Sequence, residues 1–190
     1  GPVAPNYAGE INVSASGDRL MFSAMDFTGL FSFDKSTGEV YNYRDLQTSS
    51  FTSTFSPNCN FAYAVHPVAK TIFQFDLNKI DVASTRTVIG TASNYVGSMK
   101  IGPDNKIYVA QQNSNYLARI EQPDHAGTAS NYVDQAIYLD GKRSKFGLPN
   151  FPNDFVGECA PFPADSEENN QFWTQIRNMR VMDDEANVRW

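Results

Sequence analysis

The sequence predicts an all-β fold, a partial β-propeller of about three four-stranded blades with a short C-terminal α-helical tail. Three observations lead to this prediction. Short runs of alternating apolar and polar residues are separated by turn residues, and matching runs recur at intervals of 41 to 46 residues. Aromatic residues make up 13% of the chain, which favours strands over helices. Repeats of about 40–45 residues with four strands each are typical of propeller blades.

The first repeat is built from strands joined by turn-forming residues. Ile11 and Val13 alternate with polar neighbours, which is typical of a half-buried strand. Gly17 and Asp18 favour a tight turn before the next apolar run. The expected strands are residues 10–15, 20–24, 29–34 and 39–43.

The second and third repeats follow the same plan. Their expected strands are residues 52–55, 61–65, 71–76 and 85–89, and then 96–101, 107–110, 116–120 and 135–139. Three sets of positions are expected to be equivalent: Leu20, Phe61 and Ile107; Leu30, Ile72 and Leu117; and Phe33, Phe75 and Ile120. An acid follows each member of the last set, namely Asp34, Asp76 and Glu121, and we interpret these acids as turn acceptors at strand ends.

The expected organisation is a propeller domain at 1–156, with blades at about 7–50, 51–93 and 94–141, and a linker with a helix at 157–190. A β-sandwich with similarly spaced hairpins is the alternative. Propellers usually have about four to eight blades, so three blades cannot close a ring. Further polypeptide must therefore cover the exposed sheet faces at the two ends of the array. Further blades, another protein chain or a second copy of this chain could supply it.

The tail changes character after the last repeat. Asp165 to Glu168 resembles a helix start, with carboxylates near the positive end of the dipole. Phe172, Ile176 and Met179 then share one helical face, with Trp173 beside them. We expect an amphipathic helix at 165–181 that either docks on the open blade edge of its own chain or inserts into a partner.

Composition narrows the class of function. The formal net charge is −6 and the pI about 4.8, which argues against nucleic-acid binding. The sequence has no run of 18 apolar residues, so no membrane span is expected. Cys59 and Cys159 are the only cysteines, and they could form a disulfide in an exported protein or remain two buried thiols.

Residues for catalysis or cofactor binding are not visible in the sequence. His66 and His125 lack the short spacing of a zinc site, and there is no Gly-x-Ser-x-Gly elbow for a nucleophile. Asp104 and Asn105 offer oxygens for calcium, which stays an open alternative although the usual set of about six to eight ligands is not visible. We therefore predict a non-enzymatic protein with no cofactor and no catalytic or metal residues.

Candidate contact residues come from one repeated motif and from the tail. The motif Thr-Ala-Ser-Asn-Tyr occurs at 91–95 and 128–132. Exposed Asn and Tyr side chains could contact protein or sugar, or Asn-Tyr could simply begin the innermost strand of successive blades. The candidate contact residues are Asn94, Tyr95, Asn131, Tyr132, Phe172, Trp173, Ile176 and Met179.

The blade sequences resemble those of a known group. The stretches at 16–20, 30–34 with Thr37-Gly38, and 55–58, followed by Gly-Leu-Pro-Asn-Phe at 147–151, look like the propeller of Bacteroidetes cell-surface proteins. The resemblance covers about residues 7–156. It implies an exported protein, often secreted by the type IX pathway and often carrying immunoglobulin-like and gliding-motility-associated C-terminal modules. It implies no catalytic residues.

The chain departs from that group in two places. Ala129 stands near a position where the group often has Cys, and the expected helix from Asp165 is not a feature of the group. These departures leave any disulfide pairing and the tail without support from the resemblance.

Together these observations predict an extracellular or cell-surface scaffold that binds protein or glycan. One alternative is the propeller part of a secreted hydrolase or lyase with its catalytic groups elsewhere. Another is a structural subunit of a larger surface or viral assembly, with the tail gripping a neighbour. In each case a protein partner or further blades would complete the propeller.

Overall fold

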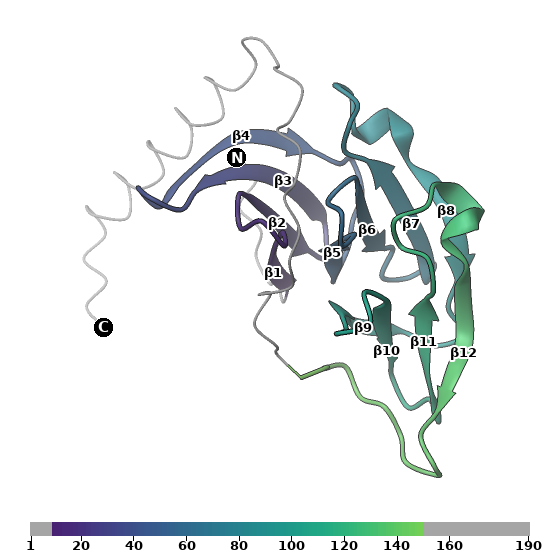
Figure 1. Cartoon of the computed structure of the whole chain (residues 1–190). Coiled ribbons are helices and arrows are strands. Elements are labelled where there is room, and N and C mark those ends of the chain that lie inside the picture. The colour runs from purple at the N-terminus through teal and green to yellow at the C-terminus, as the bar shows by residue number, and fades with distance from the viewer. Residues whose placement is uncertain (1–8, 150–190) are drawn as a thin grey trace.

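The computed structural model describes residues 9–149, which form three four-stranded antiparallel sheets (Figure 1). The first sheet contains β1 (Gly9–Val13), β2 (Arg19–Ala24), β3 (Phe27–Asp34) and β4 (Glu39–Asp45). The second contains β5 (Ser53–Phe55), β6 (Phe61–Val65), β7 (Thr71–Asp76) and β8 (Thr87–Thr91). The third contains β9 (Val96–Ile101), β10 (Ile107–Gln111), β11 (Tyr116–Ile120) and β12 (Tyr132–Tyr138).

The predicted fold class is confirmed, because each sheet resembles a propeller blade. Strand order follows chain order in every sheet. We call the sheets blade 1, blade 2 and blade 3. Short 3-10 helices at Ala83–Thr85 and Gly127–Ser130 precede the fourth strands of blades 2 and 3. The expected helix at 165–181 lies outside the described residues.

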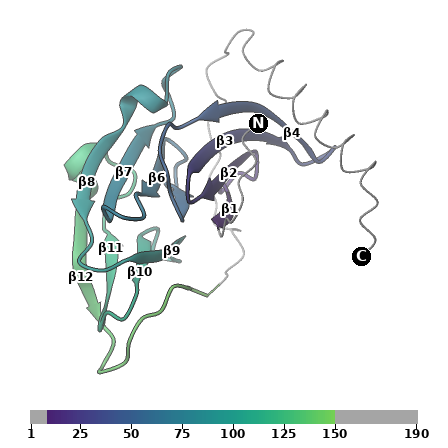
Figure 2. The same ribbon diagram turned by 180° about the vertical axis from the view of Figure 1, so that it is seen from behind.

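The first strands of the three blades form the inner part of the array. β1 contacts β5, and β5 contacts β9, whereas β4, β8 and β12 are the outer edges (Figures 1 and 2). All strand pairs are antiparallel. The links between blades and the loops between second and third strands therefore share one edge of the array, and the other loops share the opposite edge.

The turn between the first two strands of each blade is the local feature that repeats. It is closed by backbone hydrogen bonds from Ser14 to Arg19 (3.0 Å), from Ser56 to Phe61 (2.8 Å) and from Gly102 to Lys106 (2.8 Å). Each turn contains a residue with positive φ, and these residues are Gly17, Cys59 and Asn105. Gly and Asn tolerate this conformation well, which explains the turn chemistry visible in the sequence.

Two buried apolar clusters hold the blades together. The first lies between blades 1 and 2 and includes Met21, Leu30, Phe55, Ala62 and Phe75. The second lies between blades 2 and 3 and includes Tyr63, Ile72, Met99, Ile107 and Ile120. Alternate residues of β6 enter different clusters, so blade 2 is buried on both faces.

One predicted register is wrong by a single residue. Phe61 packs on the cluster toward blade 3, whereas Leu20 and Ile107 lie on the opposite faces of their sheets. Ala62 occupies the position equivalent to Leu20 and Ile107, because it lies one residue after the turn-closing Phe61. A shift of one residue in a strand exchanges the two faces of the sheet, so periodicity alone could not separate Phe61 from Ala62.

The predicted equivalences in the third strand of blade 1 are wrong by two residues. Leu20 pairs with Phe31, Ala62 with Phe75 and Ile107 with Ile120. Phe31 rather than Phe33 is therefore equivalent to Phe75 and Ile120, and by the same count Thr28 rather than Leu30 matches Ile72 and Leu117. A two-residue shift keeps the face, so the apolar pattern was the same in either alignment.

Cys59 is fully buried and disulfide-bonded, so it is not one of two free thiols. Cys159 lies outside the described residues. Within residues 9–149, no helix has the length and apolar character needed to cross a bilayer.

Candidate functional site

The outer face of blade 1, which points away from blade 2, is apolar. Residues directly opposite each other in an antiparallel sheet share a face, and Ile11 pairs with Phe22, Leu20 with Phe31, and Ala24 with Phe27. We define the apolar face of blade 1 by the following residues: Ile11, Val13, Leu20, Phe22, Phe27, Phe31, Phe33, Val40 and Tyr43.

Aromatic rings run across the apolar face of blade 1. The ring centroids of Phe22 and Phe27 are 6.0 Å apart, those of Phe27 and Tyr43 5.8 Å, and those of Phe31 and Tyr43 5.2 Å. Burial raises the pKa of the Tyr43 hydroxyl, with a smaller contribution from the Asp45 carboxylate. Neither of the two clusters between the blades includes these residues.

Two side chains of this face remain exposed. Ile11 keeps 65% of its accessible surface and Phe22 keeps 37%. Single exposed apolar residues are ordinary, but a contiguous apolar sheet face is typical of an interaction surface. The opposite face of the same sheet carries polar residues among its contacts with blade 2, including Arg19 and Ser23, which bond to Cys59 O (2.9 Å) and Ser53.

The corresponding open face of blade 3 is charged. The Lys106 ammonium lies 2.6 Å from the Glu121 carboxylate, and the Arg119 guanidinium lies 2.5 Å from its other oxygen. Arg119 also stands 5.8 Å from the centre of the Tyr108 ring. The hydrogen bond from Lys106, reinforced by Arg119, lowers the pKa of Glu121. Blade 3 therefore carries an ion-pair cluster on its open face, which the apolar face of blade 1 lacks.

A strap follows β12 and crosses blade 3, and we define it as residues 141–149. Its Ser144 exchanges backbone hydrogen bonds with Asn113 and Ser114. At Gly97 the backbone of Phe146 approaches so closely that a Cβ would lie 2.0 Å from the Phe146 carbonyl oxygen. Glycine is thus required in β9 for the strap to reach the inner strand.

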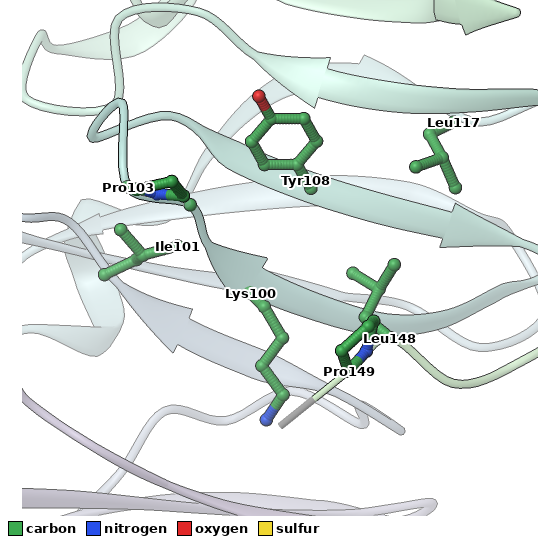
Figure 3. Close-up of a pocket in the computed structure, with 8 residues that line it drawn as sticks. Lys100, Ile101, Pro103, Tyr108, Leu117, Leu148 and Pro149 are labelled. Carbon is green, nitrogen blue, oxygen red and sulfur yellow. The ribbon is translucent and has the colours of Figure 1, made fainter. Parts of the chain in front are cut away.

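The end of the strap closes a small apolar pocket of about 220 Å³ (Figure 3). Leu148 and Pro149 form one wall, and Tyr108 on β10 and Leu117 on β11 lie across from them. Lys100 is the charged residue of this lining, and its ammonium donates to Asn12 Oδ1 over 2.8 Å. The strap therefore covers part of blade 3 and brings the chain close to β1.

A polar network joins the innermost strands of all three blades. Glu10 on β1 accepts hydrogen bonds from Thr52 (2.7 Å) and from Ser98 on β9 (2.8 Å). Thr52 in turn accepts from the backbone N–H of Met99 (3.1 Å). Asn12 donates to the Ser53 carbonyl over 2.7 Å. Each of these polar groups has a hydrogen-bond partner in the protein. We therefore interpret the network as one that holds the innermost strands together rather than as a reactive centre.

A second pocket, which is polar and has a volume of about 330 Å³, lies at the edge between blades 1 and 2. Its Arg86 donates to the Gln47 carbonyl (3.1 Å) and stands 5.2 Å from the centre of the Phe73 ring. The Asp45 carboxylate accepts from the Gln47 backbone N–H (2.7 Å), and His66 Nδ1 from Ala69 (3.1 Å). Asp45 and His66 therefore bond within their own loops, whereas Arg86 joins blade 2 to the loop that follows blade 1.

The two copies of the repeated motif occupy different places. Asn94 and Tyr95 belong to the link between blades 2 and 3, and Tyr95 is 54% exposed. Asn131 has a φ of 56° and Tyr132 begins β12. The first pair therefore lies at one edge of the array and the second pair toward the opposite edge. Only the first copy begins an innermost strand.

Tyr132 is partly buried and packs against the apolar cluster between blades 2 and 3. Its ring fills the space beside Gly90, where a Cβ would lie 2.3 Å away. Its hydroxyl donates to Asp134 over 2.8 Å, and burial followed by this carboxylate raises its pKa. Tyr132 thus has a packing role in the blade 2–blade 3 junction. The candidate residues Phe172, Trp173, Ile176 and Met179 lie outside the described residues.

Asp134 connects blades 2 and 3. Its carboxylate accepts from the Ser93 N–H (3.1 Å), the Ser93 hydroxyl (2.5 Å) and Gln111 Nε2 (2.9 Å). Burial by itself raises the pKa of Asp134, but the hydrogen bonds from Ser93, Tyr132 and Gln111 outweigh it and lower the pKa. The carboxylate therefore stays ionised and fastens the junction.

The three recurring acids have two different roles. Asp34 accepts from the Ser36 N–H (2.8 Å) and Asp76 from the Asn78 N–H (2.9 Å), which confirms them as turn acceptors. Hydrogen bonding from Ser36 lowers the pKa of Asp34. Glu121 instead forms the ion pairs with Lys106 and Arg119, so that prediction was wrong for the third repeat. In the described part of the chain, no three His, Cys, Asp or Glu side chains gather as a metal site would need.

The apolar face of blade 1 is the surface that sequence reasoning missed. A signal was present, because Phe27, Phe31 and Phe33 alternate with Thr28, Leu30 and Ser32 along one strand. The sequence could not say which of the two alternating sets faces blade 2. The packing of Met21 and Leu30 against blade 2 decided this.

Comparisons with known proteins show a distant similarity of fold, but they do not show a family or a function. No known protein family matches the chain, and no curated protein matches it in sequence. Among solved structures, it is similar to hydrazine synthase from Kuenenia stuttgartiensis, with 19% identity, a TM-score of 0.48, and coverage of 72% of this chain and 38% of that one.

Two further solved structures are similar at the same level. A luciferin-regenerating enzyme has 12% identity and a TM-score of 0.45, covering 69% of this chain and 44% of that one. The PQQ domain of pyranose dehydrogenase from Coprinopsis cinerea has 18% identity and a TM-score of 0.44, covering 56% and 33%. The chain spans less than half the length of each of these structures. The similarity is distant and concerns the β-propeller-like repeated blades alone.

Proposed function

We propose that this chain is a non-enzymatic binding and assembly scaffold, a propeller segment of an exported or cell-surface bacterial protein, and that the apolar face of blade 1 binds protein. The observation that carries the proposal is the contiguous apolar face itself, on which Ile11 is 65% and Phe22 37% exposed. An apolar sheet face of this kind is normally covered by another sheet or helix.

The occupant that fits best is a further β-sheet with an apolar face. Blade 2 shows how such a match is made, because Phe75 and Ala62 pack against Met21 and Leu30 across the blade 1–blade 2 interface. The apolar face of blade 1 likewise combines aromatic and aliphatic side chains. Glycans need convergent polar groups, and the apolar face of blade 1 offers mainly hydrocarbon.

Two observations support the proposed location outside the cytosol. Cys59 is disulfide-bonded, and stable disulfides are typical of exported proteins. The blade sequences and Gly147-Leu148-Pro149-Asn150-Phe151 resemble those of Bacteroidetes cell-surface propellers. A scaffold in an oxidising compartment is consistent with both the disulfide and the resemblance.

Photo-crosslinking tests the proposal. A benzophenone amino acid replaces Phe22 in one variant and Val88, an exposed residue of blade 2, in a control variant. We expect irradiation of cells that export the protein to yield a discrete adduct with another protein from position 22, absent from position 88 and lost when Ile11→Asp is added. If position 22 yields no adduct with another protein, or yields one that survives Ile11→Asp, the proposal is wrong.

A further inference from the structure

We infer that the polar pocket at the edge between blades 1 and 2 binds a neutral sugar residue through its hydroxyl groups. The pocket measures about 330 Å³, at the lower end of the roughly 300–1,000 Å³ that is usual for ligand sites. It is a second site beside the one in the proposed function, since only Phe27 belongs both to the pocket and to the apolar face of blade 1. Its lining consists of Asp26, Phe27, Asp45, Gln47, Thr48, Ser49, His66 and Arg86.

Both blades contribute walls to the polar pocket. Asp26 lies in the turn between β2 and β3, and residues 45–49 include the end of β4, which lies beside blade 2 (Figures 1 and 2). His66 follows β6, and Arg86 precedes β8. The Arg86 guanidinium crosses the junction and donates to the Gln47 carbonyl over 3.1 Å. Polar side chains from separate segments of the chain therefore converge on one space, as a ligand site requires.

Backbone hydrogen bonds orient the polar side chains of the pocket. Asp45 Oδ1 accepts from the Gln47 N–H over 2.7 Å, and His66 Nδ1 accepts from the Ala69 N–H over 3.1 Å. A neutral imidazole that accepts at Nδ1 carries its proton on Nε2, which makes Nε2 a donor. A carboxylate has two oxygens and a guanidinium has several N–H donors, so the backbone bonds of Asp45 and Arg86 use only part of their capacity.

The mixture of donors and acceptors selects the class of ligand. A sugar hydroxyl both donates and accepts, so it can donate to the Asp45 carboxylate and accept from Arg86 or His66. Adjacent hydroxyls on a sugar ring can use the two walls of the pocket at the same time. Hydrogen bonds that involve a charged group are stronger than those between neutral groups, which favours such contacts. A neutral ligand with adjacent hydroxyls therefore matches this lining.

The charges around the pocket disfavour an ionic ligand. The charged side chains in the lining and beside it in the junction are Asp26, Asp45, Arg44 and Arg86. Arg44 reaches across the junction and donates to the Ile80 carbonyl over 3.4 Å. Lys70, in the same turn as His66, instead donates to the Ser93 carbonyl over 2.8 Å, toward blade 3. With His66 uncharged, two acids and two bases balance, so net charge attracts neither an anion nor a cation.

Sugar titrations of the full chain test the inference. The probes are the methyl glycosides of glucose, galactose, mannose and N-acetylglucosamine, followed by saturation-transfer-difference NMR and calorimetry. We expect at least one of them to bind, with an affinity that changes little with salt because a neutral ligand forms no ion pair. Asp45→Asn keeps an oxygen for the Gln47 N–H but removes the charged acceptor, and it should weaken binding about tenfold. Asp140→Asn, in the exposed turn after β12, is the matched control and should leave the affinity unchanged.

A second pair of variants tests the wall supplied by blade 2. Arg86→Gln removes the charged donor and should also weaken binding about tenfold, whereas Arg143→Gln, at an exposed position of the strap, should not. Thermal unfolding of each variant separates lost binding from lost folding. If Arg86→Gln lowers Tm, the comparison of Asp45→Asn with Asp140→Asn decides the matter.

Three results would overturn the inference. The first is that none of the four glycosides binds. The second is that Asp45→Asn and Arg86→Gln bind the glycoside as well as the wild type does. The third is that glucuronate binds more tightly than the neutral glycosides and is released by salt, which would show an anion site. Ile11→Asp, which alters the apolar face of blade 1, should leave sugar binding unchanged, so this test and the photo-crosslinking experiment can fail separately.

Discussion

The Ser98 hydroxyl donates a hydrogen bond to Glu10 over 2.8 Å, although the two residues are 88 positions apart. This bond joins the first strand of blade 3 to the first strand of blade 1, past the intervening blade 2. The other carboxylate oxygen of Glu10 accepts from Thr52 of the blade 2 segment over 2.7 Å. The Glu10 side chain therefore forms hydrogen bonds to segments of both other blades.

Replacing Glu10 should weaken the array. Glu10→Ala removes the acceptor for Thr52 and Ser98 and leaves two polar groups near the axis without it. We expect a loss of about 1–3 kcal/mol in the free energy of unfolding, measured by urea denaturation. Glu39→Ala, at an exposed position of β4, is the control and should change stability by less than about 0.5 kcal/mol. An equal effect of both variants would contradict a clasp at Glu10.

The Asp134 carboxylate should make stability depend on pH. Its pKa is lowered in the folded protein, so it stabilises the fold above the pKa of an unfolded Asp, about 3.9, and this contribution is lost as the pH falls through the lower folded value. Asp134→Asn should therefore reduce stability by roughly 1 kcal/mol near neutral pH, with the side chain's solvent exposure limiting the effect. Thermal unfolding from about pH 7 down to about pH 3 measures it.

The difference in stability between the wild type and Asp134→Asn should shrink toward the acid end of this range. A difference between the wild type and Asp134→Asn that stays constant from neutral to acid pH would show that the carboxylate's charge is not what fastens the junction. Asp140→Asn, in the exposed turn after β12, provides a matched Asp-to-Asn control.

A methyl group at Gly97 should displace the strap. Its Cβ would lie 2.0 Å from the Phe146 carbonyl oxygen and 2.3 Å from Phe146 Cα, so the strap or β9 must shift. Gly97→Ala should speed proteolysis within residues 141–149, measured by mass spectrometry of a limited digest. Gly147→Ala is the control, since no neighbouring atom of the described residues lies within 4 Å of a Cβ there. Equal digestion of both variants would argue against strap contact at Gly97.

Reduction should destabilise the protein through Cys59. A disulfide typically contributes about 2–4 kcal/mol, mainly by restricting the unfolded chain. We expect Cys59→Ser and dithiothreitol to lower Tm to a similar degree, and peptide mapping without reduction to find Cys59 joined to Cys159, the only other cysteine of the sequence. A dithiothreitol effect that persists in Cys59→Ser would contradict this explanation.

Much of the fold was predictable because its signals are local. The turns at Gly17 and Asn105 and the alternation in residues such as 107–110 depend on backbone preferences within a few residues. The exact equivalence of strands was less predictable. Phe61 and Ala62 are both acceptable in a strand, and only the partner across the sheet decides which of them points toward blade 3.

The candidate site was predictable to a smaller degree. The sequence suggested Tyr132 as a contact residue, but it does not show that the absence of a side chain at Gly90 lets the Tyr132 ring pack against the core. Nothing in the sequence marks Glu10 as important, because its partners Thr52 and Ser98 are 42 and 88 positions away. Contacts at such separations leave no periodic trace in a sequence.

By itself, the amino-acid sequence determined that the chain forms short strands, where its turns fall, and that three similar four-stranded units follow one another. Only the tertiary structure decided which face of blade 1 is left apolar, where the strap crosses blade 3, and how Glu10 links three blades. The reason is physical: turns and strands follow from local dihedral and patterning preferences, whereas faces and clasps depend on which distant segments pack together.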